Sequence, residues 1–77
     1  MTPQEVFDYK TSWLMSRQYY TITAHSDLFS ECKRWCRDNI ARHKWSYSEY
    51  SDVWEHTFYF EEEQSAIAFE TWLDTYK

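Results

Sequence analysis

The sequence predicts an α+β fold, a small antiparallel sheet with helices packed on one of its faces. Three observations lead to this fold class. Segments with apolar residues at helical spacing alternate with short segments rich in aromatic and β-branched residues. The 77-residue length suits a single domain, residues 1–77. Glycine is absent, whereas five tryptophans, seven tyrosines and five phenylalanines are present, so rings must dominate the core and any interface.

The first predicted element is a helix from Pro3 to Met15. Thr2 suits the N-cap, Pro3 suits the first helical position, and Glu5 completes a capping box. A short isolated helix is marginal until it docks, so residues 1–16 form a helical arm that is either packed or partly frayed. The side chains expected to face inward are Val6, Tyr9, Trp13 and Leu14.

A strand from Gln18 to Ala24 and a helix from about Asp27 to His43 follow. The strand is dense in aromatic and β-branched residues, and Asp27 is the expected cap of the helix. The core face of the strand is expected to hold Tyr20, Ile22 and Ala24. One side of the helix is apolar, with Leu28, Cys32, Trp35, Cys36 and Ile40, and the other carries Lys33, Arg34, Arg37 and Arg42.

The last third of the chain predicts up to two strands and a helix. Residues Trp45–Tyr50 suit either a short edge strand or an extended loop, and the pattern does not decide between them. The clear alternation over Val53–Glu61 predicts the central strand. A helix from about Glu63 to Thr75 follows, with Trp72 at its border and Ala66, Phe69, Leu73 and Tyr76 inward.

This order of elements predicts a sheet of two or three strands in the spatial order 1-3-2, covered by helices on one face. A right-handed crossover and a hairpin between the last two strands lead to that order. Residues 17–77 would then form a βαββα core in a truncated ferredoxin-like arrangement, preceded by the helical arm.

Charge and composition exclude several classes of function. The net charge of −5 disfavours a duplex nucleic-acid binder. Residues 1–44 carry seven basic and five acidic side chains, and residues 45–77 carry one basic and eight acidic, so the halves either attract each other or form solvated faces. Phosphate-cradling loops and nucleophile elbows need the backbone freedom of glycine, so a chain without glycine is not expected to contain either. No apolar stretch suits a membrane span or a secretion signal, which predicts a cytoplasmic protein.

Two cysteines and three histidines raise the question of a metal or catalytic site. Cys32 and Cys36 lie one helical turn apart, and His25, His43 or His56 could approach them. The Cys-x3-Cys spacing is only permissive for zinc, and the chain has no second pair. Both thiols fall on the apolar stripe, where cysteine acts as a small hydrophobe. We therefore predict no metal, no cofactor, no catalytic residue and no enzymatic activity.

The chain has more aromatic rings than a small core can bury, and this surplus predicts a binding surface. We expect Tyr19, Trp45, Tyr47 and Tyr59 on an open sheet face, with Glu55, Glu61 and Glu62 as rim charges. Such a face suits a protein partner or a second copy of the chain. The alternative is single-stranded nucleic acid, stacked on the same rings and held by Arg34, Arg37 and Arg42.

Three strings also carry a resemblance to a group of known proteins. They are His-Ser-Asp-Leu at 25–28, Lys-Arg-Trp-Cys-Arg at 33–37 and Ser-Asp-Val-Trp-Glu-His-Thr-Phe-Tyr-Phe-Glu at 51–61. Most of the chain after residue 16 resembles small uncharacterised accessory proteins of T4-like tailed phages, especially those that infect marine cyanobacteria. The resemblance implies no activity, cofactor or catalytic residue. It implies a short protein in the cytoplasm of an infected bacterium, where it binds host or phage proteins.

Overall fold

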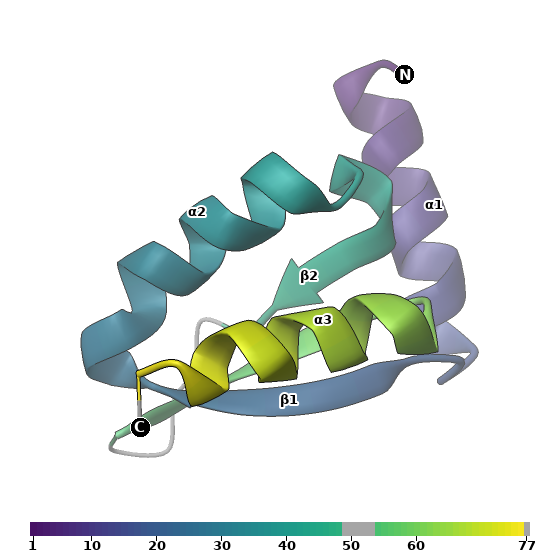
Figure 1. Ribbon diagram of the computed structural model, residues 1–77. Coiled ribbons are helices and arrows are strands. Elements are labelled where there is room, and N and C mark those ends of the chain that lie inside the picture. Colours follow the sequence, from purple (N-terminus) through teal and green to yellow (C-terminus); the bar gives the residue numbers. More distant parts are fainter. Residues whose placement is uncertain (49–53, 77) are drawn as a thin grey trace.

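The chain forms a three-stranded antiparallel sheet, in which the central strand pairs with both of the others (Figure 1). The computed structural model describes residues 1–48 and 54–76. The strand order is β1-β3-β2, which confirms the predicted α+β class, the order 1-3-2 and the N-terminal helix. The elements are α1 Pro3–Met15, β1 Tyr20–His25, the 3-10 turn η1 Ser26–Leu28, α2 Phe29–Asn39, the 3-10 turn η2 Arg42–Lys44, β2 Trp45–Tyr47, β3 Glu55–Phe60 and α3 Glu63–Asp74.

The strand register decides which backbone groups stay unpaired. The Ser26 amide donates to the Trp54 carbonyl at 2.7 Å, next to the β1–β3 ladder. Hydrogen-bonded pairs alternate in an antiparallel ladder, so Tyr20, Ile22 and Ala24 bond to β3. The residues between them, Thr21 and Thr23, therefore point their N–H and C=O groups away from the sheet.

The same alternation holds on the other side of β3. The Ser48 amide donates to the Thr57 carbonyl at 2.9 Å, and the Glu61 amide donates to the Lys44 carbonyl at 3.1 Å. Between these two bonds, Ser46 pairs with β3, and the backbone groups of Trp45 and Tyr47 point outward. Both edges of the sheet thus keep outward backbone donors and acceptors.

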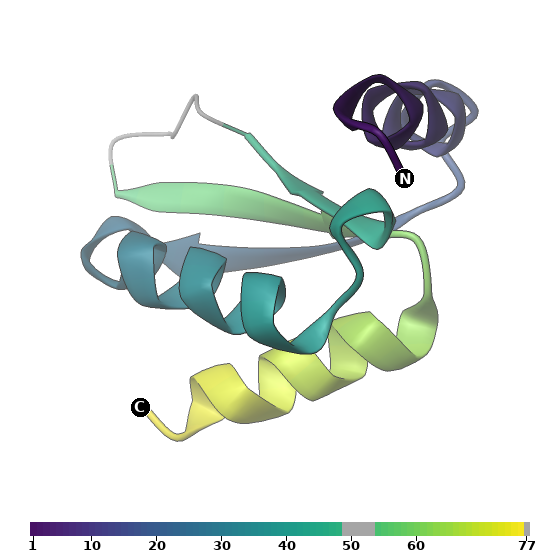
Figure 2. The ribbon, with the colours of Figure 1, turned by 90° about the horizontal axis from the view of Figure 1, so that it is seen from above.

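The core lies between β3 and the two helices α2 and α3, which cover one face of the sheet (Figure 2). Phe58 and Phe60 of β3 are fully buried, and their ring centroids lie 5.0 and 5.1 Å from that of Phe69 in α3. Cys32 and Cys36 of α2 are also fully buried. Burying each phenylalanine contributes about 1.5–3 kcal/mol, so this ring cluster is the main source of stability.

The buried residues of the C-terminal helix agree with the predicted apolar stripe, except for Tyr76, the last residue of that stripe. Ala66, Phe69 and Leu73 are buried, as expected. Tyr76 is 51% exposed, which corrects its predicted inward position. The helix ends at Asp74, so Tyr76 leaves the helical stripe and its ring packs edge-on against Trp72 at 5.1 Å.

Helix α1 is a docked element that packs beside η2. The predicted capping box is present, with the Glu5 amide donating to the Thr2 hydroxyl. Trp13 is buried, and its Nε1–H donates to the His43 carbonyl at 2.9 Å. Tyr9 was expected to face inward but is 38% exposed. Its ring lies at the margin of the contact between α1 and η2, where it meets the His43 ring edge-on with the centroids 4.7 Å apart.

The middle helix is shorter than the predicted Asp27–His43. It covers Phe29–Asn39 and is flanked by the turns η1 and η2. Asp27 does not cap it: the Asp27 amide donates to Nδ1 of His25, so the histidine side chain caps the preceding turn. Ile40 is extended and packs on the core, which ends the helix and turns the chain toward β2.

The strands also differ in extent from the prediction. β1 begins at Tyr20 and not at Gln18, and β3 covers Glu55–Phe60 within the predicted Val53–Glu61. The segment Trp45–Tyr50 contains a strand of three residues, β2. Residues 49, 50 and 53 of these predicted strands lie outside the described residues.

The end of α1 shows how a chain without glycine makes a helix stop. Arg17 has a φ of 58°, in the left-handed region that glycine usually occupies at this position. The Arg17 amide donates to the Leu14 carbonyl and the Gln18 amide to the Trp13 carbonyl, each at 3.2 Å. These two bonds form a Schellman motif, and the Cβ of Arg17 carries a steric cost there.

Replacing Arg17 with glycine is expected to raise the free energy of unfolding by about 1 kcal/mol, because glycine takes a positive φ without that cost. For a domain of this size the gain corresponds to a Tm rise of about 4–8 °C, measured by thermal denaturation with circular dichroism. The control, Arg34→Gly inside α2, is expected to lower stability by about 1 kcal/mol. A Tm of R17G at or below that of the unmodified protein would contradict the role of Arg17.

Candidate functional site

The four rings predicted to share an open sheet face are divided between two faces. Tyr19 and Tyr59 lie together, edge to face, with centroids 5.1 Å apart. Trp45 and Tyr47 lie on the opposite, helix-covered face, because they pair in register with the buried Phe60 and Phe58. The prediction that these four rings share one face of the sheet is therefore wrong.

The open face carries hydroxyl groups more than rings. Tyr59 stands there between Thr21 on β1 and Ser46 on β2, and Thr23 pairs with Thr57 on the same face. At one end of this face, Trp13 of α1 meets the ring of Tyr19 at 6.4 Å. Among the described residues, the open face therefore has no row of exposed rings on which the bases of a single strand could stack.

Two of the three predicted rim carboxylates make contacts within the fold. Glu61 accepts a hydrogen bond from the Tyr9 hydroxyl at 3.0 Å, and this bond is the main cause of a raised pKa for Tyr9. Glu62 pairs with Nζ of Lys44 at 2.8 Å, and this hydrogen bond raises the pKa of Lys44. Both contacts join the start of α3 to α1 and η2. Glu55 is exposed at the end of β3.

A basic groove runs between α1, α2, η2 and β2, and it brings together residues from both predicted sets. Its volume is about 600 Å³. Arg34, Arg37 and Arg42, expected on the basic side of the middle helix, all line it, together with Trp45 and Tyr47. The full lining, which defines the basic groove below, is Lys10, Ser30, Lys33, Arg34, Arg37, Arg42, Trp45 and Tyr47.

Local helix geometry and tertiary packing build this groove in two steps. Ser30, Lys33, Arg34 and Arg37 follow the i, i+3, i+4, i+7 spacing that places side chains on one face of α2. Helix α1 then supplies Lys10, which α1 holds over the Trp45 ring at 5.3 Å. The helical spacing in the sequence already placed Lys33 on the basic side of the middle helix. No pattern in the sequence predicted that Lys10 joins it in the groove.

The groove concentrates positive charge with little local compensation. No carboxylate lines it among the residues that the structure describes. Among the residues of the groove, Arg37 forms an ion pair with Asp38 at 3.5 Å, and both side chains are largely exposed. Burial lowers the pKa of Lys10, and the charge of Arg42 lowers it further. Mutual repulsion of this kind is relieved when an anion enters.

The two rings of the groove are mostly occupied by protein contacts. Trp45 is only 8% exposed, and its Nε1–H is buried without a hydrogen-bond partner among the described residues. Tyr47 packs against Phe29 at 5.4 Å and Phe58 at 6.3 Å, and Nζ of Lys33 lies 5.6 Å from its ring centroid. The groove therefore offers cations and a strand edge more than ring faces.

The cysteines and histidines lie apart from this groove. In the part of the chain that the structure describes, no three His, Cys, Asp or Glu side chains come together as metal ligands. His43 contacts Tyr9, and His56 stacks on Phe29 at 3.8 Å. Burial raises the pKa of Cys32 to about 11 and that of Cys36 to about 12. Thiols with such pKa values are weak nucleophiles at neutral pH.

Comparison with known proteins identifies no relative: no protein family, curated protein or solved structure matches this chain. Among the described residues, no helix has the length and apolar character needed to cross a bilayer.

In the native protein, Cys32 and Cys36 are expected to resist alkylation by iodoacetamide at pH 8. A pKa raised from 9.0 to about 11 lowers the thiolate fraction of Cys32 roughly a hundredfold, and burial blocks access as well. Mass spectrometry of timed samples measures the reaction. In guanidinium chloride both thiols should react at the rate of a free cysteine. Rapid modification of the folded protein would show that α2 leaves its core position.

Proposed function

We propose that this protein is a non-enzymatic binding module that holds an acidic segment of a partner protein in the basic groove. One observation carries the proposal, the convergence of three arginines and two lysines in one groove of a chain with a net charge of −5. Guanidinium groups bind carboxylates in a bidentate, directional manner. An acidic segment therefore supplies the missing counter-charges.

The position of the groove at the edge of the sheet favours a peptide. The backbone groups of Trp45 and Tyr47 point outward from β2 and away from β3. An extended peptide chain can pair with such an edge while its carboxylates meet the cations of α2. A nucleic-acid backbone has no alternating N–H and C=O groups for this pairing.

Single-stranded nucleic acid is the second candidate, favoured by one observation. The groove places Arg34, Arg37 and Arg42 beside Tyr47, as that alternative requires. Base stacking contributes about 1–3 kcal/mol per base only where a ring face is open. The low exposure of Trp45 and the contacts of Tyr47 limit this contribution, so the acidic peptide is preferred.

The resemblance to phage accessory proteins suggests where the partner belongs. In that context it is a host or phage protein in the cytoplasm of the infected bacterium. This context stays a prediction, as does the partner role first expected for Tyr19, Tyr59 and Glu55 on the open face.

The Arg34→Gln, Arg37→Gln double variant is expected to weaken binding of an acidic peptide about tenfold, equivalent to about 1.4 kcal/mol, since two charge-assisted contacts are lost. The probe is a fluorescein-labelled peptide of alternating glutamate and valine, and fluorescence anisotropy measures its Kd. Both arginines are exposed on α2, so circular dichroism should show an unchanged fold. Arg17→Gln, which removes a charge outside the groove, is the matched control and should change Kd less than twofold.

Oligothymidylate, titrated at two salt concentrations, separates the two candidates. Its binding, if it uses the groove, should follow a log–log salt slope of about −0.7 per phosphate contact. Tighter binding of oligothymidylate than of the peptide, lost in the double variant, would replace the first candidate with the second. Equal peptide affinity in the double variant and the unmodified protein would refute the groove as the site.

A further inference from the structure

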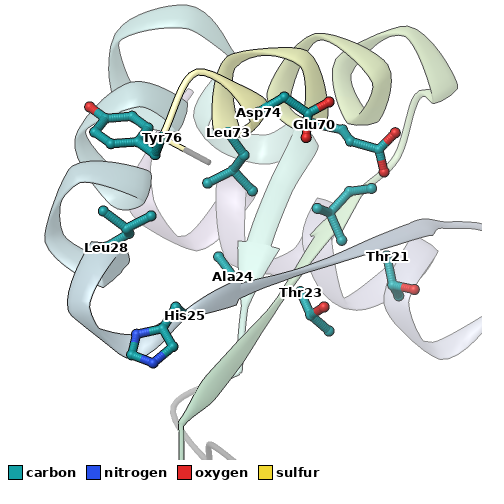
Figure 3. Close-up of a pocket in the computed structure, with 10 residues that line it drawn as sticks. Thr21, Thr23, Ala24, His25, Leu28, Glu70, Leu73, Asp74 and Tyr76 are labelled. Carbon is teal, nitrogen blue, oxygen red and sulfur yellow. The ribbon is translucent and has the colours of Figure 1, made fainter.

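A second groove lies at the opposite edge of the sheet, between β1 and α3 (Figure 3). Its volume is about 490 Å³. Apolar side chains form its floor: Ile22 and Ala24 from β1, Leu28 from η1 and Leu73 from α3. Glu70 and Asp74 of α3 stand above β1 on the rim, and Tyr76 closes one end. We call this the acidic groove, since the described residues that line it include two carboxylates and no Lys or Arg.

The edge of β1 in this groove is open for pairing. Thr21 and Thr23 point their backbone N–H and C=O groups away from β3, and no described residue forms a backbone hydrogen bond with them on that side. The six residues of β1 include neither proline nor lysine, two residues that commonly protect an edge strand from pairing. A six-residue strand spans about 20 Å, enough for a partner strand of five or six residues.

Charge decides which occupant suits this edge. A second copy paired antiparallel on β1 would bring the Glu70 and Asp74 carboxylates near those of its twin, which is unfavourable. An extended peptide with lysine or arginine meets the carboxylates with opposite charge, and the stems of those side chains can lie on the apolar floor. Glu70 is exposed, and no ion pair among the described residues uses it.

We infer that the β1 edge and the acidic groove form a second docking surface, which takes an extended basic peptide as a fourth strand. The backbone of the peptide bonds to Thr21 and Thr23, and every second side chain lies between β1 and α3. This surface is distinct in position and in sign of charge from the basic groove beside β2. The protein then has two peptide sites at the two edges of one sheet.

The test uses a labelled peptide of alternating lysine and valine and measures Kd by fluorescence anisotropy. A matched peptide with N-methyl groups on alternate residues keeps the charge and loses backbone donors, so it should bind at least about fivefold more weakly. Thr23→Pro removes an outward N–H that β3 does not use, and should weaken binding about tenfold. Glu70→Gln should weaken it about two- to fivefold, whereas Glu31→Gln, the control on α2, should not.

Amide hydrogen exchange followed by NMR locates the peptide. Protection of the Thr21 and Thr23 amides on addition of the basic peptide supports strand addition. Equal binding of the N-methylated peptide, or binding without protection at these amides, would show attraction by charge alone and overturn the inference. Protection before any peptide is added, together with a doubled mass in light scattering, would assign the edge to a second copy and overturn it too. None of these outcomes depends on the basic groove.

Discussion

The central position of β3 is the constraint on which the rest of this structure depends. Alternate backbone groups of β3 bond to β1 and to β2, while alternate side chains point to the helices and to the open face. Phe58 and Phe60 therefore meet Phe69 in the core, and Thr57 and Tyr59 face outward. The described residues form three strands, so both neighbours of β3 are edge strands, and the two grooves lie at these edges.

The uneven distribution of charge along the sequence becomes a separation of charge across the sheet. Two polar contacts between side chains of the two halves are exposed: Lys44 pairs with Glu62, and Tyr9 donates to Glu61. Exposed contacts of this kind add little to stability, so they help to position the start of α3 beside α1 and η2. Five cations gather at the β2 edge, and two carboxylates line the groove at the β1 edge. The sheet thus presents opposite charges at its two edges, an arrangement suited to contact with other chains.

Because the chain has no glycine, other residues must take the backbone conformations that glycine usually supplies. Arg17 takes the left-handed conformation that ends α1, and short 3-10 turns connect the strands to α2. The aromatic residues compensate by burying large areas in a small chain. Two rings at the margin of the core, Trp45 and Tyr47, also contact lysines of the basic groove, Lys10 and Lys33. The polar chemistry of the protein lies at its surface, whereas both thiols are sealed in the core.

Local patterns in the sequence predicted the three helices, the first and central strands and the capping box of α1, because these follow from short-range spacing. Chain connectivity predicted the strand order, whereas only the structure decided that a strand begins at Trp45. The local patterns also marked Arg34, Arg37 and Arg42 as one basic side. They did not reveal that Trp45 and Tyr47 face the helices, because a shift of one residue in pairing moves a side chain to the other face. The register of β2 on β3 sets that choice, and the docking of α1 through Trp13 brings Lys10 into the groove. Both depend on contacts between segments far apart in the chain, where local spacing carries no information.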